Sequence, residues 1–145
     1  LRMEKAYRHW GDDIGDEDTP IEAGLAWGVA FNKPGGFIGR EALLAQKETG
    51  PTRRLVQFRL EDPEPLIYHD EPVYRDGNLV GRITSGMYGH TVGSALGMAY
   101  VGCDSDTPRD QVITGAFEVD VNGTRIPATA SYRPFYDPDS KRVHL

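Results

Sequence analysis

The sequence predicts a mainly β protein of the α+β class, in which a helical N-terminal segment precedes a small antiparallel barrel or sandwich. Two observations predict this class. Helix start and stop signals are confined to roughly the first 50 residues, and short alternating apolar runs separated by turn residues fill the remainder. The 17 Gly and 10 Pro of the 145-residue chain support many short strands rather than long helices.

The first helical pattern begins at the N-terminus. Four apolar residues recur at the i, i+3, i+4, i+7 spacing of a helix, namely Met3, Ala6, Tyr7 and Trp10. They predict one or two helical turns that share an apolar face and end at Gly11.

The second helical pattern has a clear start signal. Thr19 and Glu22 have the spacing of a capping box, and Pro20 stands at the first helical position between them. We therefore expect a helix that ends near Gly28 and leads into a short strand at residues 29–31.

A third helix is predicted over residues 39–50, with the sequence GREALLAQKETG. We expect Leu43 and Leu44 to face inward and Gly50 to cap the C-terminal end of the helix.

The strand pattern begins after Pro51. Residues 54–60 alternate between apolar and polar side chains and place Val56, Phe58 and Leu60 on one face. Residues 72–83 predict a hairpin with its turn at residues 76–78.

A glycine-rich segment follows this hairpin, and it predicts a crossing that leads into a further strand. The side chains that would share one face of that strand are Leu96, Met98 and Tyr100.

The clearest hairpin signal lies at residues 117–130, where Asn122 and Gly123 form a two-residue turn. The register of this hairpin places Asp120 opposite Arg125, which predicts a cross-strand charge pair.

Composition and charge exclude several classes of partner. The net charge is −6 and no run of basic residues occurs, so we expect no nucleic-acid partner. No apolar run approaches the roughly 18 residues of a membrane span. The single cysteine, Cys103, cannot form an internal disulfide and is predicted to be a passive thiol. This usage is typical of the cytoplasm or, in a eukaryote, the mitochondrial matrix.

Motifs for metal or phosphate chemistry are absent. The four histidines are scattered, and neither an HExxH nor a CxxC pattern occurs, so we expect no metal site. The acidic residues 12–18 do not match a calcium loop, and we expect a solvated face there. The glycines between residues 86 and 97 lack a following GK[ST] motif, so close backbone packing explains them better than phosphate binding.

Glu4 is the residue with two competing interpretations. It can form an exposed i, i+4 ion pair with Arg8. Alternatively, its carboxylate can accept two parallel N–H bonds from a flat amidine edge, such as that of a pterin ring, with Tyr7 and Trp10 as stacking walls.

Five ordered segments resemble the C-terminal part of the aminomethyltransferase family, which includes the glycine-cleavage T-protein. They are LRMEKAYRHWGDDI, TPIEAGLAW, KPGGFIGREALLAQK, ITSGMYGHTVGSALGMAYV and RPFYDP. The first and third segments are most similar to the folate-binding half of dimethylglycine and sarcosine dehydrogenases. The resemblance implies that residues 1–50 are the tail of a folate-binding domain. It also implies that residues 51–145 form the family's six-stranded Greek-key-like β-barrel domain.

The resemblance also implies site residues. The glutamate of the family's LRxE motif binds the pterin end of tetrahydrofolate, and it falls on Glu4, with Tyr7 beside it. A basic residue that contacts folate falls near Lys33, and a further contact comes from the C-terminal tail, where Tyr136 and Arg142 are the candidates. The family's catalytic aspartate would lie upstream of Leu1, so this chain is expected to hold no catalytic residue.

Two other residues of the family motifs have simpler structural interpretations. Trp27 can pack in a core, and Arg40 can stabilise the start of a helix.

The resemblance implies the following parent protein. An FAD domain in a missing N-terminal part oxidises an N-methyl amine, and tetrahydrofolate captures the carbon. The present piece would form one pocket wall and a buttress, inactive alone and a weak folate binder. Its partners would be folate and the missing N-terminal domains.

An apolar surface with Met3, Tyr7 and Trp10 partly exposed would also allow self-association. The alternatives are a stand-alone docking domain, or the C-terminal part of a tetrahydrofolate-dependent demethylase or of a glycine-cleavage aminomethyltransferase.

Overall fold

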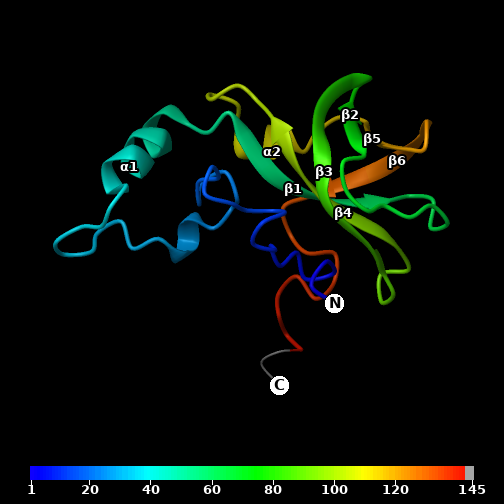
Figure 1. Ribbon diagram of the computed structural model, residues 1–145, viewed down its shortest axis with the longest axis horizontal. Coiled ribbons are helices and arrows are strands. Elements are labelled where there is room, and N and C mark those ends of the chain that lie inside the picture. Colours follow the sequence, from blue (N-terminus) through cyan, green and yellow to red (C-terminus); the bar gives the residue numbers. More distant parts are fainter. Residues whose placement is uncertain (143–145) are drawn as a thin grey trace.

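The computed structural model describes residues 1–142, in which six antiparallel strands close into one barrel (Figure 1). The strands are β1 (Arg53–Leu60), β2 (Pro72–Arg75), β3 (Asn78–Gly89), β4 (Ser94–Gly102), β5 (Phe117–Val121) and β6 (Thr124–Ser131). Their order around the barrel is β1-β4-β3-β2-β5-β6, and β6 pairs with β1 to close it. β2, β3 and β4 are neighbours in sequence order, and β1, which precedes them, pairs with β4 rather than with β2. This arrangement is a Greek key. The mainly β fold with a six-stranded barrel, predicted from the family resemblance, is confirmed.

The barrel core contains the apolar face predicted for β1. Val56, Phe58 and Leu60 are almost fully buried, and the Phe58 ring lies 5.3 Å from the Phe117 ring, centroid to centroid. The opposite face of β1 is covered as well, because Leu55 packs with Met3 of the N-terminal segment in a second apolar cluster. The barrel therefore has a core of its own, and the first residues of the chain cover it from outside.

Both predicted hairpin turns are present. Asp76-Gly77 and Asn122-Gly123 have positive φ at both positions, as a two-residue hairpin turn with the right twist requires. Asp120 faces Arg125 in the predicted register.

The charge pair predicted between Asp120 and Arg125 is wrong. Asp120 accepts the N–H of Gly123 within the turn, at 2.8 Å. Arg125 instead pairs with Glu118, at 3.8 Å, and lies over the Tyr74 ring.

The glycine-rich crossing predicted after residue 83 is also wrong, because β3 continues through it to Gly89. The glycines allow close approach inside a continuous strand. A Cβ at Gly86 would collide with the backbone carbonyl of Ile67, and a Cβ at Gly97 on β4 would lie 2.7 Å from the side chain of Ile83.

The N-terminal segment forms turns, and the predicted helix is absent. Ala6 has φ of +54°, which ends the helical path after one turn. Met3 is buried, contrary to the expected partial exposure. Tyr7 and Trp10 are 57% and 69% exposed, as expected for the apolar surface, so the four apolar residues do not share one face.

The predicted capping box is formed, but the helix behind it is not. The Thr19 N–H donates to the Glu22 carboxylate at 3.1 Å, and the Glu22 N–H donates to the Thr19 hydroxyl at 3.2 Å. Gly24 then adopts φ of +69°, and only a 3-10 turn, η1 (Ala26–Gly28), follows. The strand expected at residues 29–31 is absent, and Trp27 is 86% exposed, which excludes a core position.

Helix α1 (Arg40–Thr49) is confirmed, with the Gly50 N–H bonded to the Gln46 carbonyl at 2.8 Å. Arg40 Nε donates to the Phe31 carbonyl at 2.8 Å, which confirms its structural role at the helix start. Leu43 and Leu44 are only half-buried, so the inward-facing side of α1 was predicted wrongly.

Figure 1 shows why α1 buries so little of its surface. Residues 29–50, which we call the arm, extend away from the barrel at the left of the picture. A short helix, α2 (Arg109–Val112), lies against the barrel between β4 and β5 in sequence. Within residues 1–142, no helix is both long and apolar enough to cross a lipid bilayer.

Candidate functional site

Glu4 is the centre of the candidate site. It is only 4% exposed, and its Oε1 accepts the backbone N–H of Thr91 at 2.6 Å and of Val92 at 3.2 Å. These two residues belong to the loop between β3 and β4, so the barrel itself holds the carboxylate in place. The alternative ion pair with Arg8 is not formed, because the Arg8 guanidinium donates to the carbonyls of Ala6 and Ala23.

The electrostatics of this seat keep Glu4 ionised at neutral pH. Burial alone would raise the pKa of the Glu4 carboxyl, but the N–H groups of Thr91 and Val92 outweigh it and hold that pKa below its usual value. Both bonds end on Oε1. The Thr91 side chain also stabilises the ionised carboxylate, and Oε2 keeps lone pairs that can accept a ligand N–H.

The C-terminal tail lies against Glu4. The Tyr136 N–H donates to the Glu4 carbonyl at 3.1 Å, and the Arg142 guanidinium lies over the Tyr136 ring, 6.0 Å from its centroid. The structure therefore brings three of the predicted site residues together from opposite ends of the chain.

Lys5 fastens the tail in this position. Its side chain is almost fully buried, and Nζ donates to the Asp137 carbonyl at 2.7 Å and to the Ser140 hydroxyl at 3.2 Å. An ion pair of 3.4 Å joins Nζ to the Asp137 carboxylate. Burial would raise the pKa of that carboxyl, but bonds from the Arg142 N–H and from Lys5 lower it below its usual range.

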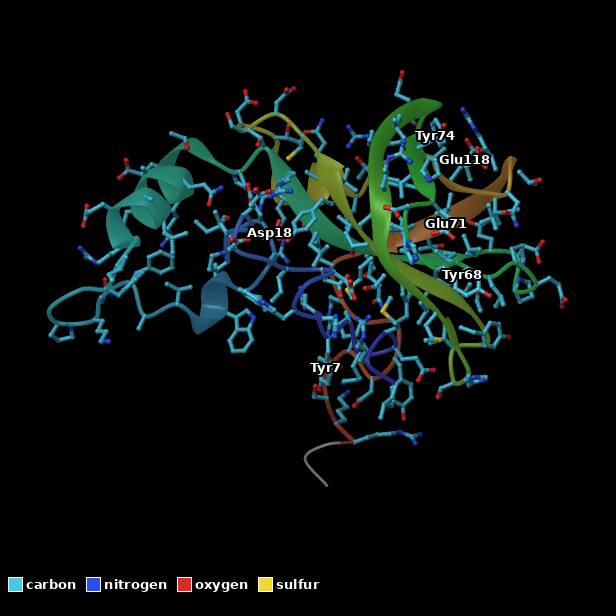
Figure 2. The ribbon with its side chains drawn as sticks, viewed as in Figure 1. Tyr7, Asp18, Tyr68, Glu71, Tyr74 and Glu118 are labelled. Carbon is cyan, nitrogen blue, oxygen red and sulfur yellow. The ribbon has the colours of Figure 1, made fainter. Side chains whose placement is uncertain are left out.

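Two predicted site residues, Tyr7 and Lys33, lie outside this cluster, and Tyr7 is the nearer of the two to Glu4 in the sequence. Tyr7 is three residues from Glu4, and Figure 2 shows its ring beside the N-terminal turns, below the barrel, whereas Tyr74 and Glu118 lie at the barrel's upper end. Lys33 lies on the arm, which extends away from the N-terminal turns (Figure 1). The fold of this chain alone does not bring Lys33 to Glu4.

Comparison with known proteins places the barrel in a family. Residues 53–137 match the model of the "glycine cleavage T-protein C-terminal barrel domain". The chain belongs to the T-protein C-terminal barrel family. The resemblance predicted from the five sequence segments is thereby confirmed.

Relatives and a solved structure extend the match beyond the barrel. The chain is 49% identical over 143 residues to 4-methylaminobutanoate oxidase (formaldehyde-forming) of Paenarthrobacter nicotinovorans. This alignment covers 99% of the present chain and 17% of the relative. It is 36% identical to mitochondrial sarcosine dehydrogenase of Homo sapiens, covering 99% of this chain and 16% of that protein.

The crystal structure of glycine cleavage system aminomethyltransferase T from Bartonella henselae superposes with a TM-score of 0.80 at 26% identity, over 95% of this chain and 37% of that one. The chain thus spans about a sixth of the length of these two curated relatives.

In this T-protein barrel, Asp13 is a buried anchor that sequence reasoning missed. Asp13 is fully buried, so the prediction of a solvated acidic face is wrong at this position. Its carboxylate accepts bonds from the His9 N–H at 2.8 Å, the Arg2 guanidinium at 3.0 Å and the Thr84 hydroxyl at 2.5 Å. It joins the N-terminal turns to β3, and a run of acidic residues carries no signal of which member is buried.

Gln57 is a second missed residue, and here a signal existed. It is a polar amide between Val56 and Phe58 in a strand that is otherwise apolar at its centre. Its Nε2 donates to the Met3 carbonyl, and its Oε1 is buried without a partner. A buried amide within an apolar run usually fixes a neighbouring backbone, and here it fixes the turn that carries Glu4.

Two further observations concern metal binding and thiol chemistry. Within residues 1–142, no three His, Cys, Asp or Glu side chains lie close enough together to hold a metal ion. Burial raises the pKa of the Cys103 thiol, which therefore stays neutral and is a poor nucleophile.

Proposed function

We propose that this chain is the C-terminal portion of a tetrahydrofolate-dependent flavoenzyme that oxidises an N-methyl amine, and that it forms one wall of the folate pocket. The observation that carries the proposal is the seat of Glu4: an ionised carboxylate, fixed by two backbone N–H groups, with Oε2 available as an acceptor. The flavoenzyme branch is supported by the identity to an oxidase and a sarcosine dehydrogenase over nearly the whole chain.

The residues near Glu4 fit the pterin end of folate. Oε2 can accept an N–H from the amidine edge of the pterin, and the exposed ring of Tyr7 offers an aromatic face for stacking. Tyr136 and Arg142 offer a polar and a cationic group on the tail beside them. Lys33 would reach the pocket only if other parts of the parent protein hold the arm close to Glu4.

The chemistry is divided between this chain and the rest of the parent protein. Tetrahydrofolate, when bound, supplies the acceptor for the one-carbon unit. In this chain Glu4 orients the pterin, while the barrel and Lys5 keep the turn and the tail rigid around it. We assign no catalytic residue and no FAD contact to residues 1–142, so the isolated chain is expected to form no methylene-tetrahydrofolate.

A glycine-cleavage aminomethyltransferase is the second candidate, and the structural match to such a protein favours it over a stand-alone docking domain. The flavin content of the purified parent protein separates the two enzymes. Bound flavin absorbance supports the flavoenzyme, and its absence supports the aminomethyltransferase.

The folate proposal is tested by titrating 5-formyltetrahydrofolate into the full-length parent protein by calorimetry. We expect Glu4→Gln to weaken binding about tenfold or more, since a hydrogen bond to a charged acceptor is worth about 1.5–3 kcal/mol. Glu64→Gln, on the exposed connection between β1 and β2, serves as the control with the same charge change. Unchanged affinity in Glu4→Gln would remove Glu4 from the pocket.

A further inference from the structure

A hollow lies between residues 21–27 and the barrel, and Glu4 is not among the residues that line it. Its volume is about 240 Å³. The side chains that matter for its chemistry are Trp27 of η1, Arg54 and Leu55 of β1, Arg109 of α2 and Tyr132, which follows β6. This volume is below the roughly 300–1,000 Å³ typical of pockets for drug-sized ligands, so the hollow suits a small organic acid or a single side chain.

The two arginines of this pocket are not neutralised by the protein. None of the ion pairs formed within residues 1–142 involves Arg54 or Arg109. Arg54 Nε is buried and has no hydrogen-bond partner. The Arg109 guanidinium lies over the Tyr132 ring, 4.4 Å from its centroid. Arg54 is half-buried and Arg109 is exposed, so the hollow presents one partly desolvated and one solvated guanidinium, neither of which is in an ion pair within residues 1–142. This arrangement favours a ligand of negative charge.

The acidic groups near these arginines are Asp104, Asp110, Tyr132 and Cys103, and no ion pair within residues 1–142 joins either aspartate to Arg54 or Arg109. Tyr132 and Cys103 do not supply the negative charge either. Burial raises the pKa of Tyr132 to about 12 in spite of Arg54 and Arg109, and its hydroxyl donates to the Arg109 carbonyl at 3.1 Å. Burial likewise raises the pKa of the Cys103 thiol beside Arg54. Both groups are therefore neutral at pH 7.

Glu22 also lines the pocket, but its carboxylate is already occupied. It accepts the Thr19 N–H at 3.1 Å and a bond from the Gln46 amide at 3.3 Å, and it pairs with Arg53 at 3.4 Å. A further cation adds to the imbalance, because the half-buried guanidinium of Arg8 lies against Gly24 at the pocket wall.

We propose that this pocket binds a carboxylate between Arg54 and Arg109. A guanidinium matches a carboxylate with two parallel N–H bonds. Trp27 and Leu55 form an apolar wall that suits a carboxylate carried on an apolar or planar body better than a bare phosphate. The carboxylate has two sources: a small free organic acid, or an Asp or Glu side chain from another part of the parent protein.

The site is tested by following the Arg54 and Arg109 Nε–H signals by NMR while glutarate is added to the 145-residue chain at constant ionic strength. Inorganic phosphate is titrated in parallel. We expect glutarate to shift both signals, and phosphate to bind more weakly. Arg54→Gln and Arg109→Gln should each weaken glutarate binding about tenfold. Arg125→Gln, on the β5–β6 hairpin, removes the same charge outside the pocket and should leave binding unchanged.

Three results would overturn the proposal: no shift of either signal, tighter binding of phosphate than of glutarate, or an equal loss in Arg125→Gln. If a glutamine variant fails to fold in a thermal melt, Arg54→Lys replaces it. That variant keeps the charge but loses the two-pronged geometry, so it should also bind glutarate more weakly.

The full-length parent protein then separates the two sources. Retained glutarate binding identifies a free organic acid as the ligand. Loss of glutarate binding in the parent, with binding retained in the 145-residue chain, identifies a side-chain carboxylate that occupies the pocket. Because these measurements report on Arg54 and Arg109, their outcome is independent of the folate titration at Glu4.

Discussion

Individual buried carboxylates attach the N-terminal turns to the barrel. Glu4 accepts backbone N–H groups of the β3–β4 loop, and Asp13 accepts the Thr84 hydroxyl of β3 together with groups from its own turn. The bonds to the ionised Glu4 carboxylate are charge-assisted, and such bonds are stronger than neutral ones. The positions of these two side chains, more than helix formation, determine the path of residues 1–14.

The pH dependence of stability follows from Glu4. Its pKa in the folded protein lies below its ordinary value of 4.5, so its stabilising contribution is fully present above about pH 4.5. As the pH falls through the folded pKa, the carboxylate becomes protonated and that contribution is lost. We therefore expect the difference in unfolding free energy between wild type and Glu4→Gln to shrink from pH 6 to pH 3, as measured by urea denaturation.

Glu64→Gln provides the reference for this experiment, because it makes the same chemical change at an exposed position. A constant gap between wild type and Glu4→Gln over the same range would contradict the assignment.

At the scale of elements, the glycines of β3 are required by packing rather than by turns. Gly81 and Gly86 lie where neighbouring backbone approaches so closely that a Cβ would collide with a carbonyl, that of Tyr100 and that of Ile67 respectively. Flexible side chains can move aside, but a backbone carbonyl moves only with its own strand or connection.

Gly86→Ala should therefore destabilise the protein by about 1–3 kcal/mol, because the new methyl group forces the Ile67 connection away from β3. Chemical denaturation measures the change. Gly28→Ala is the matched control: a Cβ there meets nothing within 4 Å, and its φ is not positive. Equal stability of the two variants would show that the Ile67 connection is not held against β3.

The element scale also shows what the sequence could predict. Local chemistry determined where elements begin and turn: the Thr19–Glu22 capping box, the Gly50 cap and the two hairpin turns were all predicted correctly. The lengths of elements depended on tertiary contacts. The capping box is followed by a single turn because Gly24 takes a left-handed conformation. No local sequence pattern predicts that β3 continues through three glycines.

The candidate site was predictable in part for a related reason. The resemblance brought together Glu4, Tyr136 and Arg142, and the structure places them side by side. Lys33 was carried over from the same resemblance, but it lies on the arm. Its position relative to Glu4 depends on whatever supports residues 29–50, and periodicity within this chain cannot supply that information. Arg54 and Arg109 were missed because only the closed barrel makes them neighbours.

At the scale of the whole molecule, the barrel is closed and well packed, whereas the arm buries little of its surface. The barrel has a closed hydrogen-bond ladder and a buried core, whereas no residue of α1 is buried. Ile38, within the arm, is fully exposed, and Trp27, two residues before the arm begins, is 86% exposed. Apolar side chains exposed on a poorly packed segment are typical of a surface that another domain covers.

The two tryptophans make this idea measurable. In the 145-residue chain both Trp10 and Trp27 are largely exposed, so iodide should quench the fluorescence of each. Trp10→Phe and Trp27→Phe isolate one indole at a time. We expect the Trp27 signal to become much less accessible to iodide in the full-length parent protein, because the domains that cover the arm would shield it. Equal quenching of Trp27 in the short chain and in the parent would show that no other domain covers the surface next to the arm, contrary to this prediction.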